Sequence, residues 1–218
     1  TACRRQRQMC IRDRHRTVAA LMGGGPESGL HRSEDGGETW TELKSGLPNY
    51  AGKIGFTLSP QKPDVLYASI ELEKRNGAVY KSEDRGSSWK KMSDLSLGYG
   101  TGPHYYQELF ASPHKFDRLY LMNVRILTSE DGGKTFVELT ERSKHSDNHA
   151  IAFREDDPNY LLVGTDAGIY ESFDLAKTWK YHKNLPITQF YKVAVNNAYP
   201  FYHIFGGTQD NGSAGGPS

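Results

Sequence analysis

The sequence predicts an all-β protein built from repeated units, and three observations support this. A short pattern, Ser-x-Asp-x-Gly-x-Thr/Ser-Trp/Phe, occurs four times in the 218 residues, at 33–40, 82–89, 129–136 and, in degenerate form, 172–179. The first residues of successive copies are 49, 47 and 43 positions apart, a period typical of β-propeller blades. Short β-rich runs bounded by Pro, Asp, Asn and Gly separate the copies, as expected for strands and hairpins.

Each copy of the pattern, called an Asp box below, has the chemistry of a tight hairpin turn. The Asp carboxylate can accept backbone N–H groups, and the Gly allows a positive φ. The closing Trp or Phe brings a large apolar side chain into the core. The fourth copy has Leu175 and Ala176 in the turn, so we expect a strained turn or one of a different type. Calcium binding is not expected, because Gly37 and Gly133 stand where an EF-hand loop needs an oxygen ligand.

Pairs of apolar runs, each pair split by a turn, predict two further strands in each repeat. The pairs are at 54–58 and 65–70, 107–110 and 119–124, 150–153 and 160–163, and 191–195 and 202–205. Each repeat then has four antiparallel strands, A to D, with the Asp box between C and D, which is one propeller blade. Residues 17–22 fit strand B of a first blade, and the last pair fits strands A and B of a fifth.

About four blades are therefore represented, and the first and last are partial. An open arc of blades leaves strand edges unpaired, whereas a closed ring hides them. We expect an incomplete arc of a larger propeller, with the rest of the ring missing from this chain. A closed ring of four blades is the less favoured alternative.

Composition excludes several classes of partner. The chain carries 27 Lys and Arg against 26 Asp and Glu, so its charge favours neither nucleic acid nor an anionic membrane. No run approaches the roughly 18 apolar residues that predict a membrane span. No cofactor and no metal site are expected. His145 and His149, with Asp147 between them, would converge only on a helix, and this segment is predicted as a loop that enters a strand.

Residues 1–16 are rich in arginine and hold both cysteines of the chain. A basic nucleic-acid-binding arm is one interpretation. We favour another, in which the segment is non-native because it resembles a translated sequencing adapter, and we exclude it from fold reasoning. The native part then covers 17–218 and contains no cysteine, and any native signal peptide has been lost.

The strand order divides the loops between two faces of the propeller. The A–B turns and the Asp boxes share one face, and the D–A and B–C loops share the other. Ligand sites need polar and aromatic groups that converge, and the second face is richer in them. Candidate ligand-binding residues on it are His104, Tyr105, Tyr106, Asn148, His149, Gln189, Tyr191, Gln209 and Asn211. Candidate catalytic carboxylates on it are Asp147, Asp166 and Asp210.

Three functions are compatible with these residues. The face could bind a glycan or a polypeptide, since Tyr-rich surfaces provide contact area at a low entropy cost. It could hydrolyse glycosides with two of the carboxylates, which would need one raised pKa and a separation of about 5–9.5 Å. It could also be a structural or assembly scaffold in which these residues only cap turns, as Asp210-Asn211-Gly212 would. The residues alone leave open whether the protein is an enzyme.

Several segments resemble one family. The Asp boxes, Leu-Ser-Pro-x-x-Pro-Asp-x-Leu-Tyr at 58–67, Ser-Asp-Asn-His at 146–149, Gln-Phe-Tyr at 189–191 and Gly-Gly-Thr-Gln-Asp-Asn-Gly-Ser at 206–213 are similar to bacterial BNR-repeat propellers. These are described as sortilin N-terminal-like or as glycosyl hydrolases of the xyloglucanase-like type. The resemblance covers about 17–218. It implies an extracytoplasmic propeller, sortilin-like, that binds a glycan or polypeptide, or else a glycoside hydrolase.

Overall fold

The computed structural model describes residues 17–21, 28–73, 76–96, 108–185, 190–208 and 212–217. The chain divides into two compact units, Thr1–Tyr181 and His182–Ser218. The adapter-like segment 1–16 lies outside the described residues, so the prediction about it stays a prediction.

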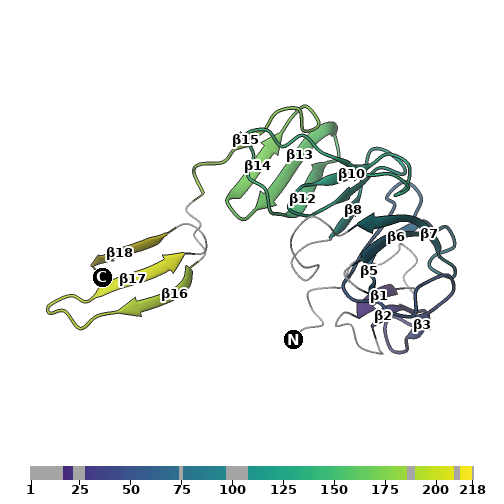
Figure 1. Ribbon diagram of the computed structural model, residues 1–218, viewed down its shortest axis with the longest axis horizontal. Helices are drawn as coiled ribbons and strands as arrows, with labels where there is room; N and C mark the ends of the chain where they lie inside the picture. Colours follow the sequence, from purple (N-terminus) through teal and green to yellow (C-terminus); the bar gives the residue numbers. More distant parts are fainter. Residues whose placement is uncertain are drawn as a thin grey trace. The chain divides into compact units, whose positions relative to one another are not determined.

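All regular elements of the described residues in unit 1 are β-strands, arranged in four antiparallel sheets (Figure 1). The first sheet has strands β1 (Thr17–Leu21), β2 (Gly29–Ser33) and β3 (Thr41–Leu43). The other three each have four strands in chain order. They are β4 (Ile54–Leu58), β5 (Leu66–Glu71), β6 (Asn76–Ser82) and β7 (Lys90–Ser96); β8 (Leu109–Ala111), β9 (Leu119–Leu121), β10 (Leu127–Ser129) and β11 (Val137–Glu138); and β12 (Asn148–Arg154), β13 (Asp157–Thr165), β14 (Gly168–Ser172) and β15 (Lys180–Tyr181). These are the predicted blades, and the all-β fold class is confirmed.

Unit 2 is a three-stranded antiparallel sheet over its described residues. Its strands are β16 (Phe190–Val195), β17 (His203–Thr208) and β18 (Ser213–Pro217). The sequence predicted only the first two. The third was missed because Ser-Ala-Gly-Gly-Pro has no β-branched or aromatic residue and is typical of a turn.

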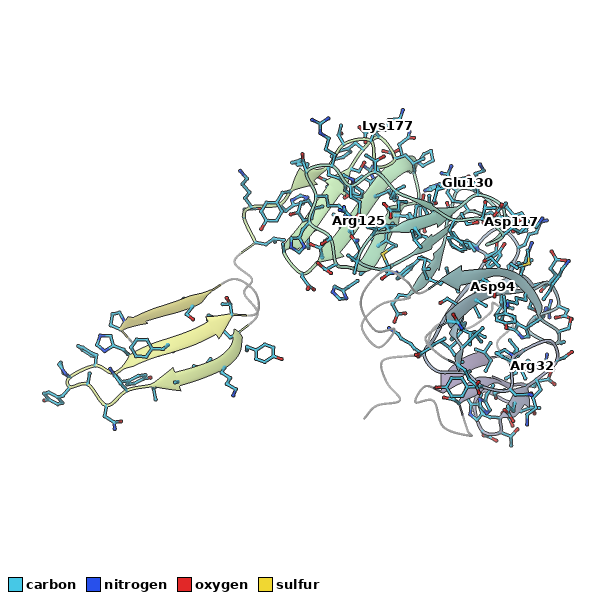
Figure 2. The ribbon with its side chains drawn as sticks, in the orientation of Figure 1. Arg32, Asp94, Asp117, Arg125, Glu130 and Lys177 are labelled. Atoms are coloured by element: carbon cyan, nitrogen blue, oxygen red, sulfur yellow. The ribbon has the colours of Figure 1, made fainter. Side chains whose placement is uncertain are left out.

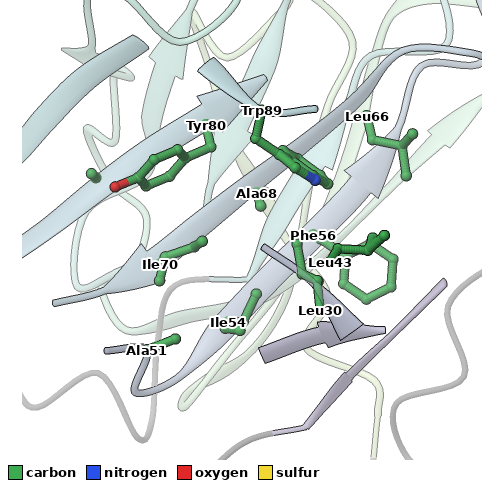
Figure 3. Close-up of a cluster of buried hydrophobic side chains, with 11 residues drawn as sticks. Leu30, Leu43, Ala51, Ile54, Phe56, Leu66, Ala68, Ile70, Tyr80 and Trp89 are labelled. Atoms are coloured by element: carbon green, nitrogen blue, oxygen red, sulfur yellow. The ribbon is translucent and has the colours of Figure 1, made fainter. Parts of the chain in front are cut away.

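Successive sheets of unit 1 pack face to face through buried apolar side chains. In β5, side chains alternate: Leu66, Ala68 and Ile70 lie in a cluster with Leu30 and Leu43 of the first sheet (Figure 3). The alternate residue Tyr67 faces the other way and packs with Leu109, Leu119 and Leu121 of the third sheet. A third cluster joins Tyr120 and Met122 to Ile151, Leu161 and Val163 of the fourth sheet. The period of two in a strand therefore gives each middle sheet two buried faces, which explains its short, almost continuous apolar runs.

All four Asp boxes form the same turn. In each, the Ser hydroxyl donates to the Asp carboxylate at 2.7–2.9 Å and accepts a backbone N–H four residues later at 2.8–2.9 Å. The Asp carboxylate also accepts the backbone N–H of the Thr or Ser four residues on, at 2.8–2.9 Å. Two successive residues have positive φ in every box.

The fourth box decides between the two alternatives predicted for it, a strained turn or one of a different type. Its hydrogen bonds match those of the other three, so the turn type is the same. The expected strain is present, because Leu175 has φ 56° and Ala176 has φ 70°, where a left-handed conformation crowds the Cβ atom. The shared Ser–Asp–Thr hydrogen bonds hold the turn despite the missing glycine.

Candidate functional site

We call the side of unit 1 that carries the Asp boxes the Asp-box rim, and the side that carries the loops β9–β10, β11–β12 and β13–β14 the loop rim. Backbone hydrogen bonds join these three loops. The N–H of Asp147 donates to the carbonyl of Val124 at 2.9 Å, and that of Asn148 to the carbonyl of Asn123 at 3.1 Å. The N–H of Asp166 donates to the carbonyl of Asp147 at 3.2 Å. Loops of the third and fourth sheets are therefore held in register with each other.

A fully buried ion pair lies within the β11–β12 loop itself. Lys144 Nζ is 2.8 Å from Glu141 Oε1, and the two side chains are 0 % and 1 % exposed. Lys144 also donates to the carbonyl of His145 at 2.8 Å, and its ammonium group lies 5.4 Å from the centre of the Trp179 ring. Burial lowers the pKa of Lys144, while the adjacent Glu141 carboxylate opposes that shift. A charge this deeply buried is tolerated only with a partner and hydrogen bonds.

Asn148 belongs to this buried network. Its amide group donates to the carbonyls of Asn123 and Val124 at 3.1 and 3.0 Å and to Glu141 Oε1 at 2.9 Å, and its oxygen accepts from Lys144. The residue is 0 % exposed. These contacts support a structural role for Asn148. Ligand contacts on this part of the loop rim would therefore be made by the neighbouring residues. Sequence reasoning missed Glu141 and Lys144, because a Glu-x-x-Lys spacing in a polar loop gives no sign of burial.

Above the network lies a group of five partly exposed polar side chains, which we call the rim cluster. Its members are Arg125, His145, Asp147, His149 and Asp166, with 25–49 % of each side chain exposed. His149 Nε2 is 2.6 Å from Asp166 Oδ1. Asp147 accepts from the Ser146 hydroxyl at 2.8 Å, and Arg125 lies 3.4 Å from Glu141 Oε2. The structure thus brings together Asp147, His149 and Asp166 of the predicted site.

Local backbone geometry presents Asp147 at this position. Asp147 has φ 61°, a left-handed conformation that Asp tolerates better than most residues. Asp147 directly precedes β12, and Asp166 directly follows β13, the strand that pairs with β12. The two residues therefore lie beside each other at the ends of these paired strands. The loop rim of unit 1 therefore carries acceptors, a cationic donor and imidazoles on neighbouring loops.

A second group of charges occupies the loop rim one sheet earlier. Lys53 donates its backbone N–H to Glu71 Oε2 at 2.9 Å, and its Nζ lies 3.2 Å from Glu108 Oε1 of the third sheet. Gly52 makes room for the Glu71 carboxylate, since a Cβ atom there would lie 2.2 Å from Glu71 Oε2. Sequence reasoning missed Lys53 and Glu108.

The remaining predicted residues are placed elsewhere. Tyr191 lies on β16 in unit 2 and is 71 % exposed. Seven candidates lie outside the described residues, and their roles stay predictions: His104, Tyr105, Tyr106, Gln189, Gln209, Asp210 and Asn211. Within the described part of the chain, no group of three His, Cys, Asp or Glu side chains could hold a metal ion. No helix among the described residues is long and apolar enough to cross a membrane.

Comparison with known proteins identifies a shared fold. No family model matches the sequence, and no curated protein matches it significantly. The structure is similar to the GH74 enzyme of Niastella koreensis, with a TM-score of 0.61 and 15 % identity over 90 % of this chain and 32 % of that one. It is also similar to an ancestral GH74 enzyme, with a TM-score of 0.57 and 11 % identity over 98 % of this chain and 30 % of that one. The chain thus spans about a third of the length of these enzymes.

A YCF48 structure with a bound D1 peptide aligns with 88 % of this chain and 86 % of its own, with a TM-score of 0.43 and 14 % identity. A similarity at that level carries no functional argument. Together with the repeated four-stranded sheets, the matches to the GH74 enzymes define the class: this chain is part of a β-propeller with the fold found in GH74 glycoside hydrolases. At these identities the likeness concerns the fold, and function depends on the residues of the site.

Proposed function

We propose that this propeller binds a glycan on its loop rim, with the rim cluster as the contact surface. One observation carries the proposal: partly exposed donors and acceptors stand on loops fixed by a fully buried ion pair. Side chains held in place before binding lose little conformational entropy when a ligand arrives, and this increases affinity. Carboxylate, imidazole and guanidinium groups together can donate to and accept from sugar hydroxyls.

The test is a glycan array followed by titration of the full-length protein with soluble polysaccharides, xyloglucan among them. Asp166→Asn and His149→Gln, alone and together, should weaken binding about tenfold, the loss expected when one or two hydrogen bonds to a charged group are removed. Lys134→Gln is the control, since this exposed charge stands in the third Asp box. Figure 2 shows Glu130 of that box apart from Arg125 of the rim cluster. Unchanged binding in the double variant would contradict the proposal.

A second candidate is glycoside hydrolysis, supported by Asp147 and Asp166 lying side by side and by the fold shared with GH74 enzymes. One carboxylate would act as acid and the other as base or nucleophile. Reducing sugar released from xyloglucan by the native protein, and lost in Asp147→Asn, would establish hydrolysis. Binding of xyloglucan without release of reducing sugar would support glycan binding and not hydrolysis.

A polypeptide ligand or an assembly scaffold is the outcome to pursue if neither binding nor hydrolysis is seen. We also propose an extracytoplasmic location, which rests on the resemblance to BNR-repeat propellers. Fractionation of cells that express the full-length gene tests it, and protein found only in the cytoplasm would overturn it.

A further inference from the structure

Strand β4 shows how the first strand of a sheet packs when it is regular. Its buried residues Ile54 and Phe56 pair with Ile70 and Ala68 of β5. A single residue therefore separates the two buried side chains, and both lie in the cluster shared with the first sheet. Side chains alternate along a strand, so residues two apart face the same way. The first strand of the third sheet, β8, also pairs residue for residue with its neighbour.

Strand β12 has the same place in the fourth sheet but contains one residue more. Its buried residues Asn148 and Ile151 pair with Thr165 and Val163 of β13, so two residues stand between them. Both nevertheless contact the third sheet, through the Asn148 amide group and through the apolar cluster around Ile151. A regular strand cannot direct residues three apart to one face. A β-bulge makes this possible, and the additional residue is His149.

Packing against the preceding sheet does not account for the extra residue. Each of β4, β8 and β12 is an edge strand of a four-stranded sheet, and the first two pack on the preceding sheet without a bulge. A bulge leaves one residue out of the hydrogen-bonded ladder. Bulges also occur next to functional sites, where they change the direction of a side chain. The bulge in β12 is therefore better explained by the residue that it places.

The bulge places His149 on the loop rim, with its Nε2 atom 2.6 Å from Asp166 Oδ1. The N–H of Asp166 donates to the carbonyl of Asp147 at 3.2 Å, and in the second sheet that of Glu71 donates to the carbonyl of Lys53 at 2.9 Å. Two carboxylates therefore oppose each other where the second sheet has opposite charges. Like charges at opposed positions destabilise a sheet, and the imidazole lies beside one of them. These three side chains stand at the ends of the strands.

Unit 2 contains the same kind of bulge in its own first strand. Phe190 pairs with Thr208 and Lys192 with Gly207, which leaves Tyr191 as the extra residue. In the fourth sheet and in unit 2 the opposing strand carries Gly-Thr at this point, while the extra side chain differs. A fixed scaffold that presents different side chains is typical of positions that serve recognition.

We propose that the β-bulge in β12 makes His149 the specificity-determining residue of the loop-rim site. The bulge aims the imidazole at Asp166, and the two side chains together contact neighbouring hydroxyl groups of the glycan. This inference rests on the proposed function and adds which residue selects the ligand and what places it. A carboxylate and an imidazole 2.6 Å apart bind two hydroxyls only when the hydroxyls have a matching orientation. Sugars that differ in the configuration of one hydroxyl should therefore be distinguished.

Cellohexaose and mannohexaose are the probes, because their sugar units differ only in the configuration at C2. Calorimetric titration of the full-length protein with each probe gives the two affinities and their ratio. We expect the native protein to bind one probe about tenfold more tightly than the other, since the mismatched hydroxyl loses a hydrogen bond to a charged group.

Three variants separate the imidazole from its placement. His149→Ala/Ala150→His keeps the composition and moves the ring by one residue. Ala150→His alone adds a ring at the same exposed position but keeps His149, and it is the matched control. Deletion of Ala150 keeps the ring and restores the one-residue spacing of β4, so Asn148 and Ile151 still face the third sheet. We expect the control to bind like the native protein, and the other two to bind the preferred probe about tenfold more weakly and to lose the selectivity.

A spectroscopic measurement tests the placement without a ligand. In the native protein, Asp166→Asn should shift the NMR signals of the His149 ring, and after deletion of Ala150 the same substitution should leave them unchanged. Thermal unfolding shows whether each variant is folded, and if the deletion does not fold, His149→Ala/Ala150→His decides.

Native affinity and native selectivity in His149→Ala/Ala150→His would overturn the inference. A native protein that binds the two probes equally, or neither of them, overturns it as well. In these cases binding of other glycans on the array would leave the proposed function standing, whereas a native protein that binds no glycan refutes both.

Discussion

On the Asp-box rim the Ser and Asp side chains of each box form their hydrogen bonds within the eight residues of that box, whereas on the loop rim the bonds of Asn148 cross from one sheet to the next. The Asp131 carboxylate accepts hydrogen bonds from Ser129, Lys134 and Thr135, all in its own box. Asn148, by contrast, binds Asn123, Val124 and Glu141 of the preceding segment. The first kind of contact stabilises a turn wherever it occurs. The second depends on how neighbouring sheets pack, so a change there is transmitted between blades.

The largest effect on the free energy of unfolding is expected at Gly46, where the β3–β4 loop passes close to the second sheet. A Cβ atom on Gly46, in the loop β3–β4, would lie 1.8 Å from the carbonyl oxygen of Trp89, and the backbone there has φ +79°. Gly46→Ala should therefore lower the free energy of unfolding by more than about 3 kcal/mol or prevent folding, since both strain and overpacking act together. Thermal unfolding followed by circular dichroism measures this.

Gly36→Ala is the control for Gly46→Ala. Gly36 lies in the first Asp box with the same φ of +79°, but nothing stands within 4 Å of its Cβ position. Gly36→Ala should lower the free energy of unfolding by only about 1–2 kcal/mol, which is the cost of placing a residue with a Cβ atom in the left-handed conformation. Equal costs at the two glycines would show that the β3–β4 loop moves away from Trp89 freely, and that the close approach of Gly46 to the second Asp box does not limit stability.

The buried ion pair comes next. Lys144→Met removes the nearer and fully buried of the two cations beside Glu141 and leaves only Arg125 at 3.4 Å, which should destabilise the protein by about 3 kcal/mol, and Lys144→Met/Glu141→Leu should recover part of the loss. Lys134→Met, an exposed lysine in the third Asp box, is the control and should change stability by less than about 0.5 kcal/mol. Urea unfolding gives both values. A double variant less stable than Lys144→Met would mean that the charges are not coupled as the structure shows.

Lowering the pH should remove a stabilising contribution of the Asp-box rim to the free energy of unfolding. The backbone N–H and hydroxyl of Thr135 and the Ser129 hydroxyl lower the pKa of Asp131 from 3.8 to about 2. Because the folded pKa lies below the unfolded one, the unfolded chain binds more protons between them. The stabilisation is thus complete above about pH 4 and is lost as the pH falls toward 2. We expect the Asp131 carboxylate to contribute about 1 kcal/mol to the free energy of unfolding, because solvent screens its interactions.

The stability difference between native protein and Asp131→Asn, measured from pH 5 to pH 2, should therefore shrink as the pH falls. Glu155→Gln, which removes an exposed carboxylate from the β12–β13 turn, is the control and should show a smaller change. A difference between native and Asp131→Asn that is constant over this range would contradict the assignment.

The smallest effect on stability is expected in the rim cluster. The His149–Asp166 pair is 40 % exposed on both sides, so His149→Gln should change the free energy of unfolding by less than about 0.5 kcal/mol. The same variant should weaken glycan binding. A variant that loses stability and keeps its affinity would place His149 with the structural contacts rather than with the ligand.

The sequence was most informative where structure is local. The four Asp boxes and the strands before them follow from turn chemistry and from period-two patterning, and even the degenerate box keeps its Ser, Asp and Thr. The Glu141–Lys144–Asn148 network could not be predicted, because burial of these polar residues results from the packing of two sheets. For the same reason Asp147, His149 and Asp166 could be assigned to one face, but their mutual contacts could not. The β-bulge that places His149 becomes visible only when strand register aligns β12 with β4.

The local hydrogen bonding of the Ser and Asp side chains also affects how such a chain can change over generations. Because these two side chains bond within the box, the turn they hold can be duplicated or lost together with its strands without a matching change in a distant side chain. Blade number and blade decoration can therefore vary independently. Phe173 illustrates this independence: the fourth box has an exposed aromatic side chain where the other three have Glu, and its Ser172, Asp174 and Thr178 hydrogen bonds match those of its neighbours.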